Sequence, residues 1–525
     1  MTPQTPTAKL GYRQAFRDVS KLAFPVILSN LLISLTNVAD VFMVGRLGPL
    51  ELAAVGMATN IRFFVNVSVL MLITGAMALL AQAKGAGDSK RMSFVVRQTF
   101  SLMLLFSALL TFVGLLSSEA LLNFLNSGGD ARAVGLARSY LDILFWGTVC
   151  VVAHFTINSL MQAAGDTITP LYLSIAVNVL NILINYLLIF GPGPFPALGV
   201  TGAAIGTFVA RLLGVAVGLY LIYSGRNVIR VLPGSYLPNW QMFKDIMTIG
   251  IPGGLQGVVR NGASFVLVRI ATSTSAGTYA AAAMSIGMQV ESLAFMPGLG
   301  LNIAATSLVG QSLGAWQLEK ARMYGNVSIL LGAMLMGCIG VLLAVFAGPI
   351  VRFFEPSAHP IVQSAGTSYI VINGLFQPLL AVSMIANGAL RGAGHTRPGL
   401  MANLIGRGFV MLPLAAFLAL GLGIGVEGVW IAMVVGFTIT ASYAFGVWRK
   451  GDWAQVALEK SEVYRQHLYQ LPSEVRARFL ADIKSPLMAF PNAREEVSSD
   501  KVIYHLEDRA VEVEIDAQDY HVKPN

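Results

Sequence analysis

A single carboxylate stands in the first long apolar stretch of the chain. Between Lys21 and Arg46 the only ionisable side chain is Asp40, in the run SLTNVADVFMVGR at residues 34–46. An ionised carboxylate in apolar surroundings costs several kcal/mol unless a partner compensates it, so such residues usually mark ion or substrate pathways. The position of Asp40 therefore predicts a residue that exchanges a proton or holds a cation. A static ion pair inside a helical bundle is the alternative.

A second set of charges lies in the other half of the chain. Glu291 is in the middle of SIGMQVESLAFMPG, and Arg260 is in LQGVVRNGASF, both otherwise apolar. Two interpretations are open: the two residues form a structural ion pair, or Glu291 is a second site for a proton or a cationic substrate. Arg211 and Arg407 lie in further apolar segments, and we interpret them as packing or snorkelling residues.

Two segments match enzyme motifs, but neither lies in the structural setting that its motif requires. GQSLG (310–314) fits GxSxG and GIGVEG (423–428) fits GxGxxG, but both adjoin predicted membrane spans and lack the strand–turn–helix setting that these motifs need. Cys150 and Cys338 have no disulfide or metal-ligand spacing. We therefore expect neither an enzyme nor an ATP-driven pump, and neither a cofactor nor a structural metal.

The composition indicates what positions these charges. Of 525 residues, 55% are hydrophobic and 12% are charged, about half of the roughly 25% charged content of soluble domains. The mean hydropathy is +0.67. Apolar stretches recur, each near the roughly 20 residues with which a helix crosses a bilayer. We predict an all-α membrane protein with twelve transmembrane helices at about residues 19–45, 51–80, 92–116, 135–163, 167–190, 199–224, 246–270, 278–309, 323–348, 360–390, 396–420 and 425–448.

The loop charges predict an orientation. Fifteen Lys and Arg residues fall in or beside one set of alternate loops and five in the other set. This positive-inside bias puts both termini in the cytoplasm, for a multi-pass protein of the cell inner (plasma) membrane. The N-terminal residues lack a short apolar stretch followed by a small-residue cleavage site, so we expect no removable signal peptide and a first helix that inserts uncleaved. The net charge of +8 is then a topology signal, and without a clustered basic face we expect no nucleic-acid partner.

The two halves of the apolar region repeat each other. At an offset of 227, LAFPVIL (22–28) aligns with IGIPGGL (249–255) and ELAAVGMAT (51–59) with TYAAAAMSI (278–286). At an offset two residues longer, AQAKGAGD (81–88) aligns with GQSLGAWQ (310–317) and NSLMQAAGDTITP (158–170) with NGALRGAGHTRP (387–398). Each half holds six spans, so the pseudo-two-fold axis runs along the membrane normal. A binding site between the halves and alternating access are typical of such repeats.

These observations divide the chain into five parts. We predict a cytoplasmic N-terminus (1–18), an N-lobe (19–224), a cytoplasmic inter-lobe linker (225–245), a C-lobe (246–448) and a cytoplasmic tail (449–525). The tail is polar, and we predict a cytoplasmic appendage. Its stretch VIYHLEDRAVEVEIDA alternates apolar and polar residues, which indicates either a short strand or disorder.

Several segments resemble a known family. FPVILSNLLISLTNVADVFMVGRLGPLELAAVGMA (24–58), AAGDT (163–167), NILINYLLIFG (181–191) and GVTGAAIGT (199–207) are similar to the multidrug and toxic compound extrusion (MATE) family, most of all its DinF-like prokaryotic branch. The resemblance covers about residues 15–448. It implies a V-shaped pair of six-helix lobes that exports organic, often cationic compounds in exchange for H⁺ or Na⁺.

The resemblance also implies roles for individual residues. Asp40 matches the coupling carboxylate of the DinF-like branch, and Asn181 and Thr207 match its partners. Where that branch has a second aspartate this chain has Asn185, so the pocket holds one carboxylate, with Asn178, Asn181 and Asn185 on nearby turns of one helix. Low hydration disfavours ionised Asp40, and amides can hydrogen-bond either protonation state. These features favour H⁺ over Na⁺, for which Asp40, Asn181, Asn185, Thr207 and the Ala203 carbonyl are the available oxygen ligands.

Two prolines in predicted helices are candidate hinges. Pro25 lies in the first span and Pro297 in the eighth, and each removes a helical hydrogen bond. In the MATE family, bending of the first helix at such a proline is a proposed response to protonation of the aspartate. A kink near the helix start is the simpler interpretation of Pro25.

The sequence thus predicts a monomeric secondary antiporter in the lipid bilayer that exports small cationic or amphipathic organic compounds. A flippase for lipid-linked oligosaccharides has a related architecture, and it would be favoured if Arg260, Arg211 and Arg407 all faced one central cavity. A membrane sensor that signals through its tail is a further alternative.

Overall fold

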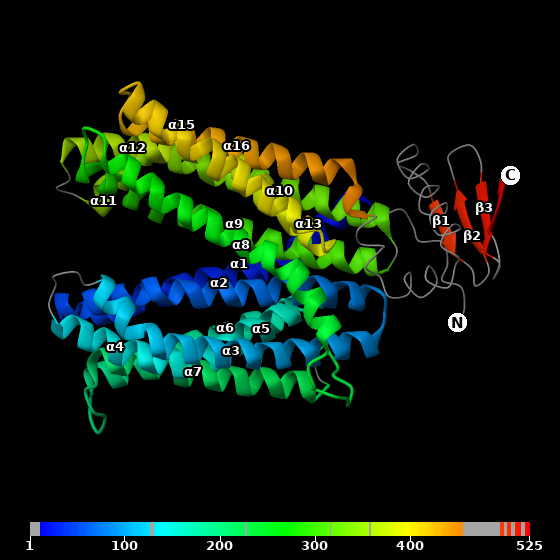
Figure 1. The fold of residues 1–525 in the computed structure, drawn as a ribbon, viewed down its shortest axis with the longest axis horizontal. Coiled ribbons are helices and arrows are strands. Elements are labelled where there is room, and N and C mark those ends of the chain that lie inside the picture. The colour runs from blue at the N-terminus through cyan, green and yellow to red at the C-terminus, as the bar shows by residue number, and fades with distance from the viewer. Residues whose placement is uncertain are drawn as a thin grey trace.

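The chain forms two bundles of long helices, seen side by side in Figure 1. The computed structural model describes residues 11–125, 131–225, 228–315, 317–355 and 359–454, and the strand residues 494–497, 501–505, 510–515 and 520–524. The first half contains α1 (Tyr12–Gly45), α2 (Pro49–Gly85), α3 (Ser89–Leu125), α4 (Ala131–Trp146), α5 (Thr148–Ala163), α6 (Ile168–Phe190) and α7 (Gly199–Tyr223).

The second half repeats this order. It contains α8 (Trp240–Thr272), α9 (Thr278–Gly314), α10 (Leu318–Val345), the short α11 (Ala347–Phe354), α12 (Pro360–Leu375), α13 (Gln377–Gly392), α14 (Arg397–Asn403), the π-helix η1 (Leu404–Met411), α15 (Leu412–Ala416), the π-helix η2 (Phe417–Gly421) and α16 (Val426–Lys450). The segments from α14 to η2 follow one another directly and form one pass.

The predicted spans agree with the helices, but one of the helices is less apolar than the others. Among the described residues, nine helices are long and apolar enough to cross a membrane, and two bent pairs raise the number to up to eleven. The remaining predicted span, 246–270, corresponds to α8. Its 33 residues are long enough, but it is not among the helices apolar enough to qualify, because glycines, Gln256, Arg260 and Asn261 interrupt its apolar residues.

The two bends are copies of each other. α4 and α5 meet at 51° and α12 and α13 at 52°. The residues at the breaks, Gly147 and Phe376, are related by the longer of the two repeat offsets. Both halves therefore fold with the same bend in their fourth span, which supports the internal duplication.

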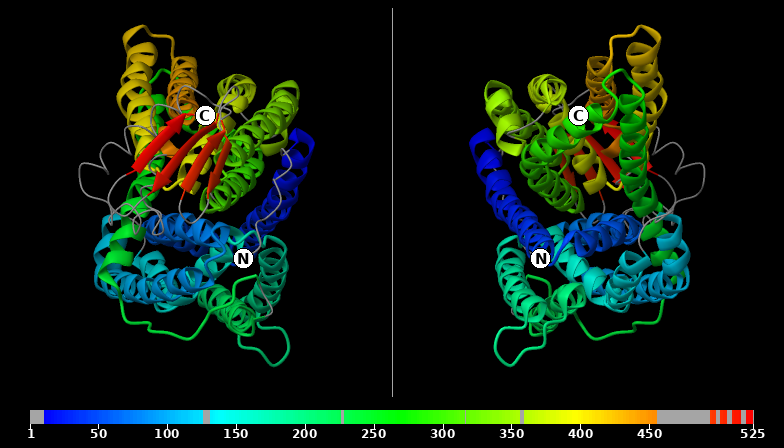
Figure 2. Two further views of the ribbon diagram at one scale, coloured as in Figure 1. Left: turned by 90° about the vertical axis from the view of Figure 1, so that its right-hand side faces the viewer. Right: turned by 90° about the vertical axis from the view of Figure 1, so that its left-hand side faces the viewer.

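Helices α1 and α8 each join both bundles. Ala15, Val19 and Ala23 of α1 are buried with Leu301 and other residues of the second half, whereas Asp40, further along α1, bonds to α6. In the same way Ile246 of α8 is buried in the core of the first half, and its C-terminal part is buried with the second half. The two helices lie on opposite sides of the molecule (Figure 2). The start of each lobe's first helix therefore packs with the opposite lobe, and the division of the chain into lobes stays a prediction.

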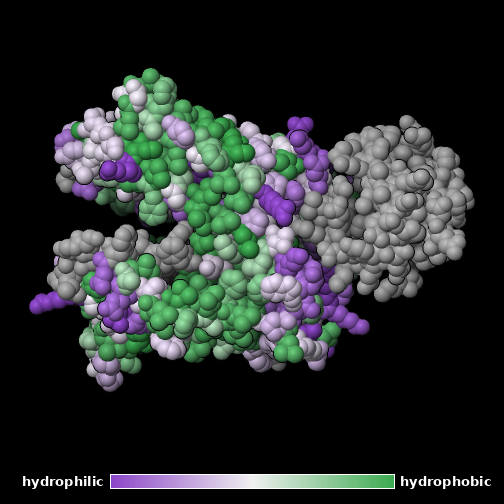
Figure 3. All heavy atoms as spheres, in the orientation of Figure 1, coloured by the Kyte–Doolittle hydropathy of each residue, from purple (hydrophilic) through white to green (hydrophobic). Residues whose placement is uncertain are grey.

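Among the described residues, the two lobes approach each other most closely at one end. There the last turns of α2 and α9 cross so closely that a Cβ atom at Gly85 would lie 1.8 Å from the carbonyl oxygen of Gln311. We call this the closed end. In the space-filling view a hollow separates the lobes at the opposite end, which we call the open end (Figure 3). The lobes thus enclose a V-shaped cleft, as the family resemblance implied.

Apolar side chains cover the outside of the lobes. Figure 3 shows hydrophobic residues over the middle of both lobes and hydrophilic residues towards the ends. On α3 the exposed large side chains include Leu104, Leu109, Phe112 and Leu116. An exposed apolar face of this extent is expected where lipid, rather than water, surrounds the protein.

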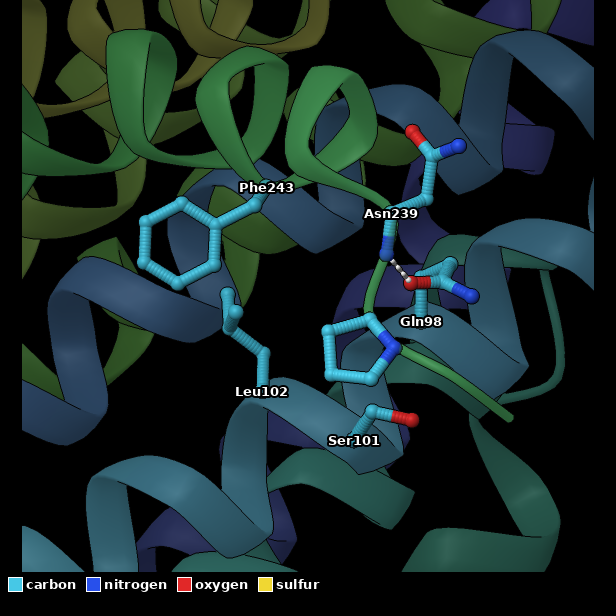
Figure 4. A pocket seen from close by; sticks show the side chains of 6 residues that line it. Gln98, Ser101, Leu102, Asn239 and Phe243 are labelled. Carbon is cyan, nitrogen blue, oxygen red and sulfur yellow. Dashed lines mark hydrogen bonds between the residues drawn. The ribbon is translucent and has the colours of Figure 1, made fainter.

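The connection between the lobes is attached along α3. Helix α8 begins at Trp240, inside the predicted linker of 225–245, because the Asn239 side chain accepts a hydrogen bond from the Met242 backbone N–H. Gln98 of α3 donates to the Leu237 carbonyl (2.9 Å) and accepts from the Asn239 N–H (2.7 Å; Figure 4). Because these bonds fix the connection to α3, the start of α8 is fixed on the first lobe.

Helix ends follow local sequence signals, and the tail adds a small sheet. Gly165 and Gly394 have positive φ after α5 and α13, as glycines that end helices commonly do. In the tail, β1 (Arg494–Val497), β2 (Lys501–His505), β3 (Ala510–Ile515) and β4 (Tyr520–Pro524) form an antiparallel sheet in chain order. The alternating stretch in the tail is therefore strand rather than disorder at 501–505 and 510–515.

Candidate functional site

Asp40 lies in a network of amide and hydroxyl groups from three helices. The Asn185 amide on α6 donates to the Asp40 carboxylate at 2.7 Å and lies 3.4 Å from the Asn181 side-chain oxygen. Asn181 in turn donates to the Thr207 hydroxyl on α7 at 3.2 Å. Asn185 is fully buried, Asn181 and Thr207 are nearly so, and Asp40 is half-buried. The structure therefore brings together Asp40, Asn181, Asn185 and Thr207.

A glycine makes room for Asn185. Helices α6 and α7 pack so closely that a Cβ atom at Gly206 would lie 2.0 Å from the Asn185 side-chain oxygen. Asn181 and Asn185 are one helical turn apart, so their amides lie on the same face of α6. The site is thus built by two asparagines on α6, opposed by Gly206 and Thr207 on α7.

The other residues predicted for the site lie outside this network. The Asn178 amide nitrogen is buried and has no hydrogen-bond partner within the described part of the protein, and no hydrogen bond there joins it to Asp40. Ala203 is buried on α7, one turn before Thr207. Within the described residues no group of three His, Cys, Asp or Glu side chains could hold a metal ion.

The amide of Asn185 can hydrogen-bond either protonation state of Asp40. Asn185 presents N–H to the ionised carboxylate, while its own side-chain oxygen is buried without a partner in the described protein. Rotation of the amide would present that oxygen to a protonated Asp40, because an amide donates and accepts at opposite positions.

A second polar group lies in the C-lobe. The Tyr369 hydroxyl on α12 donates to the Glu291 carboxylate at 2.7 Å. The Arg260 guanidinium lies over Phe295 at 5.4 Å, and that of Arg407 lies over Phe437 at 4.6 Å. Among the described residues no ion pair within 4.0 Å joins Glu291 to Arg260. The structure therefore gives Glu291 a hydroxyl partner where the sequence considered an ion pair, and the role of Glu291 stays a prediction.

The three arginines predicted from the sequence do not all lie in one lobe. Arg211 lines a small pocket inside the N-lobe with residues of α2, α4 and α5, including Leu141 and Thr148, and its guanidinium is 5.9 Å from the Phe155 ring centroid. Arg407 belongs to η1 in the C-lobe and is 9% exposed. Arg211 and Arg407 thus occupy separate lobes.

The prolines lie inside continuous helices. Pro25 is buried within α1, Pro252 lies within α8 at the repeat-related position, and Pro297 is buried within α9. Pro25 is more than three turns from the start of α1 at Tyr12, so it is not a helix-start proline. Whether Pro25 and Pro297 act as hinges stays a prediction.

Two residues of these sites were not predicted from the sequence. Gly206 lies in GAAIGT and could have been found from the spacing, because it directly precedes Thr207. Tyr369 is a lone tyrosine in an apolar span, and only the fold shows that it contacts Glu291. The repeat carried a signal for it, since the longer offset relates Tyr369 to Tyr140.

Fold and site together define a class of protein. Two repeated six-helix lobes with apolar outer faces surround a cleft, and one lobe holds a carboxylate among amides inside the membrane region; this is the organisation of a multi-pass membrane transporter, and not of an enzyme. The MatE family model matches residues 25–187 and 252–417, once in each half, and the chain belongs to this family.

Curated relatives cover most of the chain. "Probable multidrug resistance protein NorM" of Thermotoga maritima is 28% identical over 442 residues, which span 84% of this chain and 94% of that protein. "Multidrug resistance protein NorM" of Burkholderia vietnamiensis is 29% identical over 428 residues, 81% of this chain and 91% of that protein. These relatives are NorM proteins, so the closer assignment to the DinF-like branch stays a prediction.

Solved structures share the fold. One described as "Outward-facing conformation of a multidrug resistance MATE family transporter of the MOP superfamily" has a TM-score of 0.78 and 22% identity, and the match covers 87% of this chain and 100% of that one. A MOP superfamily transporter from Pyrococcus furiosus has a TM-score of 0.77 at 22% identity with the same coverage. The two-lobe architecture predicted from the sequence is therefore confirmed.

Proposed function

We propose that this transporter is a multidrug efflux antiporter that exports organic cations in exchange for protons. The observation that carries the proposal is the hydrogen bond from Asn185 to Asp40, the carboxylate of the N-lobe site. One carboxylate can hold either a proton or an organic cation. Because the two compete, binding of one releases the other, and this exclusion couples their opposite movements across the membrane.

Orientation follows from the loop charges. The loops with most Lys and Arg residues adjoin the closed end, where α2 and α9 finish. By the positive-inside rule this end faces the cytoplasm, together with both termini, and the cleft opens to the outside. We assign the protein to the cell inner membrane as a monomer, since each chain carries both lobes.

The substrate class rests on relatives and on charge. The named relatives are multidrug resistance proteins, and a negative site within the membrane favours cationic or amphipathic organic compounds. We propose H⁺ as the coupling ion over Na⁺, because N–H groups contact the oxygens of Asp40 and Thr207. Glu291, hydrogen-bonded to Tyr369, is proposed as a second site in the C-lobe.

The flippase alternative has less support. A pyrophosphate-linked substrate would be favoured by three arginines facing one cavity, but Arg211 lies in the N-lobe, apart from Arg260 and Arg407 of the C-lobe.

The test is transport by the purified protein in proteoliposomes. A cationic dye is loaded, and a proton gradient or a sodium gradient is imposed separately. We expect the proton gradient, and not the sodium gradient, to drive dye movement against its concentration gradient. Dye movement driven by sodium alone would contradict proton coupling, and no driven movement for any of a panel of cationic dyes would contradict the exporter.

Replacing Gly206 by alanine is expected to damage the site directly. The new Cβ would lie 2.0 Å from the Asn185 side-chain oxygen, so Asn185 must move away from Asp40. A clash of this kind in a packed core costs about 1–3 kcal/mol, and we expect proton-driven transport to fall about tenfold or more. The matched control is Gly262→Ala in α8, where a Cβ meets nothing within 4 Å. Equal transport by the two variants would show that the packing of Asn185 does not matter.

A further inference from the structure

Two glutamines connect the lobes across the closed end. Gln82, in the last turns of α2, donates its side-chain amide to the carbonyl of Gly392 in the other lobe at 3.0 Å. Gln311, in the last turns of α9, donates to the carbonyl of Ala163 in the first lobe at 2.9 Å. Each glutamine therefore belongs to one lobe and bonds to the opposite one.

The two contacts are copies of one another under the internal repeat. The offset that aligns AQAKGAGD with GQSLGAWQ relates Gln82 to Gln311, and the same offset relates Ala163 to Gly392. A reciprocal pair of this kind is what an interface about a two-fold axis produces, where residue i contacts j and j contacts i. The bonds thus mark the place where the pseudo-two-fold axis passes between the lobes.

The two acceptors are carbonyl groups at helix C-termini, which make no hydrogen bond within their own helix. Ala163 is the last residue of α5, and Gly392 is the last residue of α13. After each helix, a turn through a glycine satisfies earlier carbonyls: Gly165 and Asp166 donate to Gln162 and Met161, and the corresponding bonds occur after α13. The final carbonyls have no partner within their own helix. Each glutamine therefore completes the end of a helix in the opposite lobe.

Glycines allow the approach that these bonds require. A Cβ at Gly85 would lie 1.8 Å from the Gln311 carbonyl oxygen, and a Cβ at Gly314 would lie 1.9 Å from that of Gln82. Gly85 and Gly314 are again related by the repeat offset. Small residues permit backbone contact of this kind between helices in membranes, so any side chain at either position would separate α2 from α9.

The repeat is not perfect at this point. The Ser307 hydroxyl also donates to the Ala163 carbonyl at 3.1 Å and lies 2.9 Å from the Gln311 amide. The repeat-related position of Ser307 is Ala78, which has no hydroxyl. The bond made by Gln311 is therefore supported by a neighbour, and the bond made by Gln82 is not.

We propose that Gln82 and Gln311, with the carbonyls of Gly392 and Ala163, form a reciprocal amide clasp that gates the closed end of the transport cleft. The clasp rests on the alternating access of the proposed function: it holds in the state open to the outside and separates in the state open to the cytoplasm. Its groups are neutral, so it can open without leaving a buried charge unpaired. The freed carbonyls then face the water that enters at that end.

The experiment measures the separation of the lobes at both ends. In a chain without Cys150 and Cys338, one spin-label pair replaces Lys90 and Glu319 beside the closed end, and another replaces Leu52 and Tyr279 at the open end. All four positions lie within three residues of the start of a helix, and each pair is related by the repeat. Pulsed electron resonance of the full chain in lipid nanodiscs then gives both distance distributions, and it needs no substrate.

The expected result is a shift of population. Loss of one neutral hydrogen bond corresponds to about a fivefold change in an equilibrium, so Gln82→Ala and Gln311→Ala each increase the closed-end long-distance population by about that factor. The double variant increases it by about 25-fold. Gly314→Ala separates the helices further, and the open-end distance shortens whenever the closed-end distance lengthens.

The matched control is Gln98→Ala. Gln98 is a glutamine near the same end, but it bonds to the connection that lies along α3 and not across to the C-lobe. An unchanged distribution in the double variant, or an equal shift in Gln98→Ala, overturns the clasp. Because the distances do not depend on transport, failure of the clasp is distinguishable from failure of the proposed antiport, which the dye assay measures.

Discussion

Asp40→Asn is expected to abolish proton-driven transport while leaving the protein folded. The asparagine has nearly the same shape and volume as the aspartate, so it still fits against Asn185 and the packing of α1 against α6 is preserved. It cannot change its protonation state or balance an organic cation, however. Dye movement driven by a proton gradient in proteoliposomes should fall to the level of protein-free vesicles, and thermal unfolding in detergent should change little.

The matched control is Asp142→Asn on α4. Asp142 is also an aspartate in a helix, but its side chain is 41% exposed and lies 4.0 Å from Arg138, a surface contact that contributes little. We expect transport near the wild-type rate. If Asp40→Asn retained proton-driven transport, the coupling proton would have to be carried elsewhere, and Glu291 would be the next residue to replace.

Much of the fold could be predicted because membrane helices are fixed by short-range patterns. A span needs about 20 apolar residues, and its backbone hydrogen bonds are made within the helix, so length and composition define it. Span 246–270 is an exception, because its composition does not define it as a membrane helix. It was predicted with the others from its apolar residues, and the alignment of Pro252 with Pro25 gives it independent support.

The network around Asp40 could be predicted only in part. The contact of Asn185 with Asp40 joins residues on α1 and α6, and no local pattern brings them together; the family resemblance supplied it. Asn178 shares a face of α6 with Asn181 by spacing, yet it does not join the network, because helical spacing fixes direction and not depth in the bundle.

The packing of the starts of α1 and α8 with the opposite lobe could not be predicted from the sequence. Ala15 of α1 and Ile246 of α8 look like ordinary apolar residues, and the choice of lobe depends on shape complementarity across the whole bundle. The clasp was within reach, since the repeat aligned Gln82 with Gln311. Only the structure shows that the aligned glutamines contact the opposite halves.

Asn185→Asp is expected to convert the site towards sodium. It restores the second carboxylate of the DinF-like pattern, and it places that group where the Asn185 amide now lies, 2.7 Å from an Asp40 oxygen. Two carboxylates at this distance cannot both be ionised unless a proton or a cation lies between them. The variant also loses the N–H group that contacts Asp40, and in its place it offers one more hard oxygen ligand, which Na⁺ prefers.

We therefore expect a sodium gradient to drive dye movement in Asn185→Asp, and proton-driven movement to decrease. Asn178→Asp is the matched control: it adds the same charge to α6, at a position with no hydrogen bond to Asp40 among the described residues, and should not create a sodium response. A sodium response in both variants would mean that net charge in the lobe, and not contact with Asp40, selects the ion. If neither variant responds to sodium and proton coupling is unchanged in both, Asn185 does not tune the coupling carboxylate, and the single-carboxylate site owes its ion preference to the hydration of Asp40 alone.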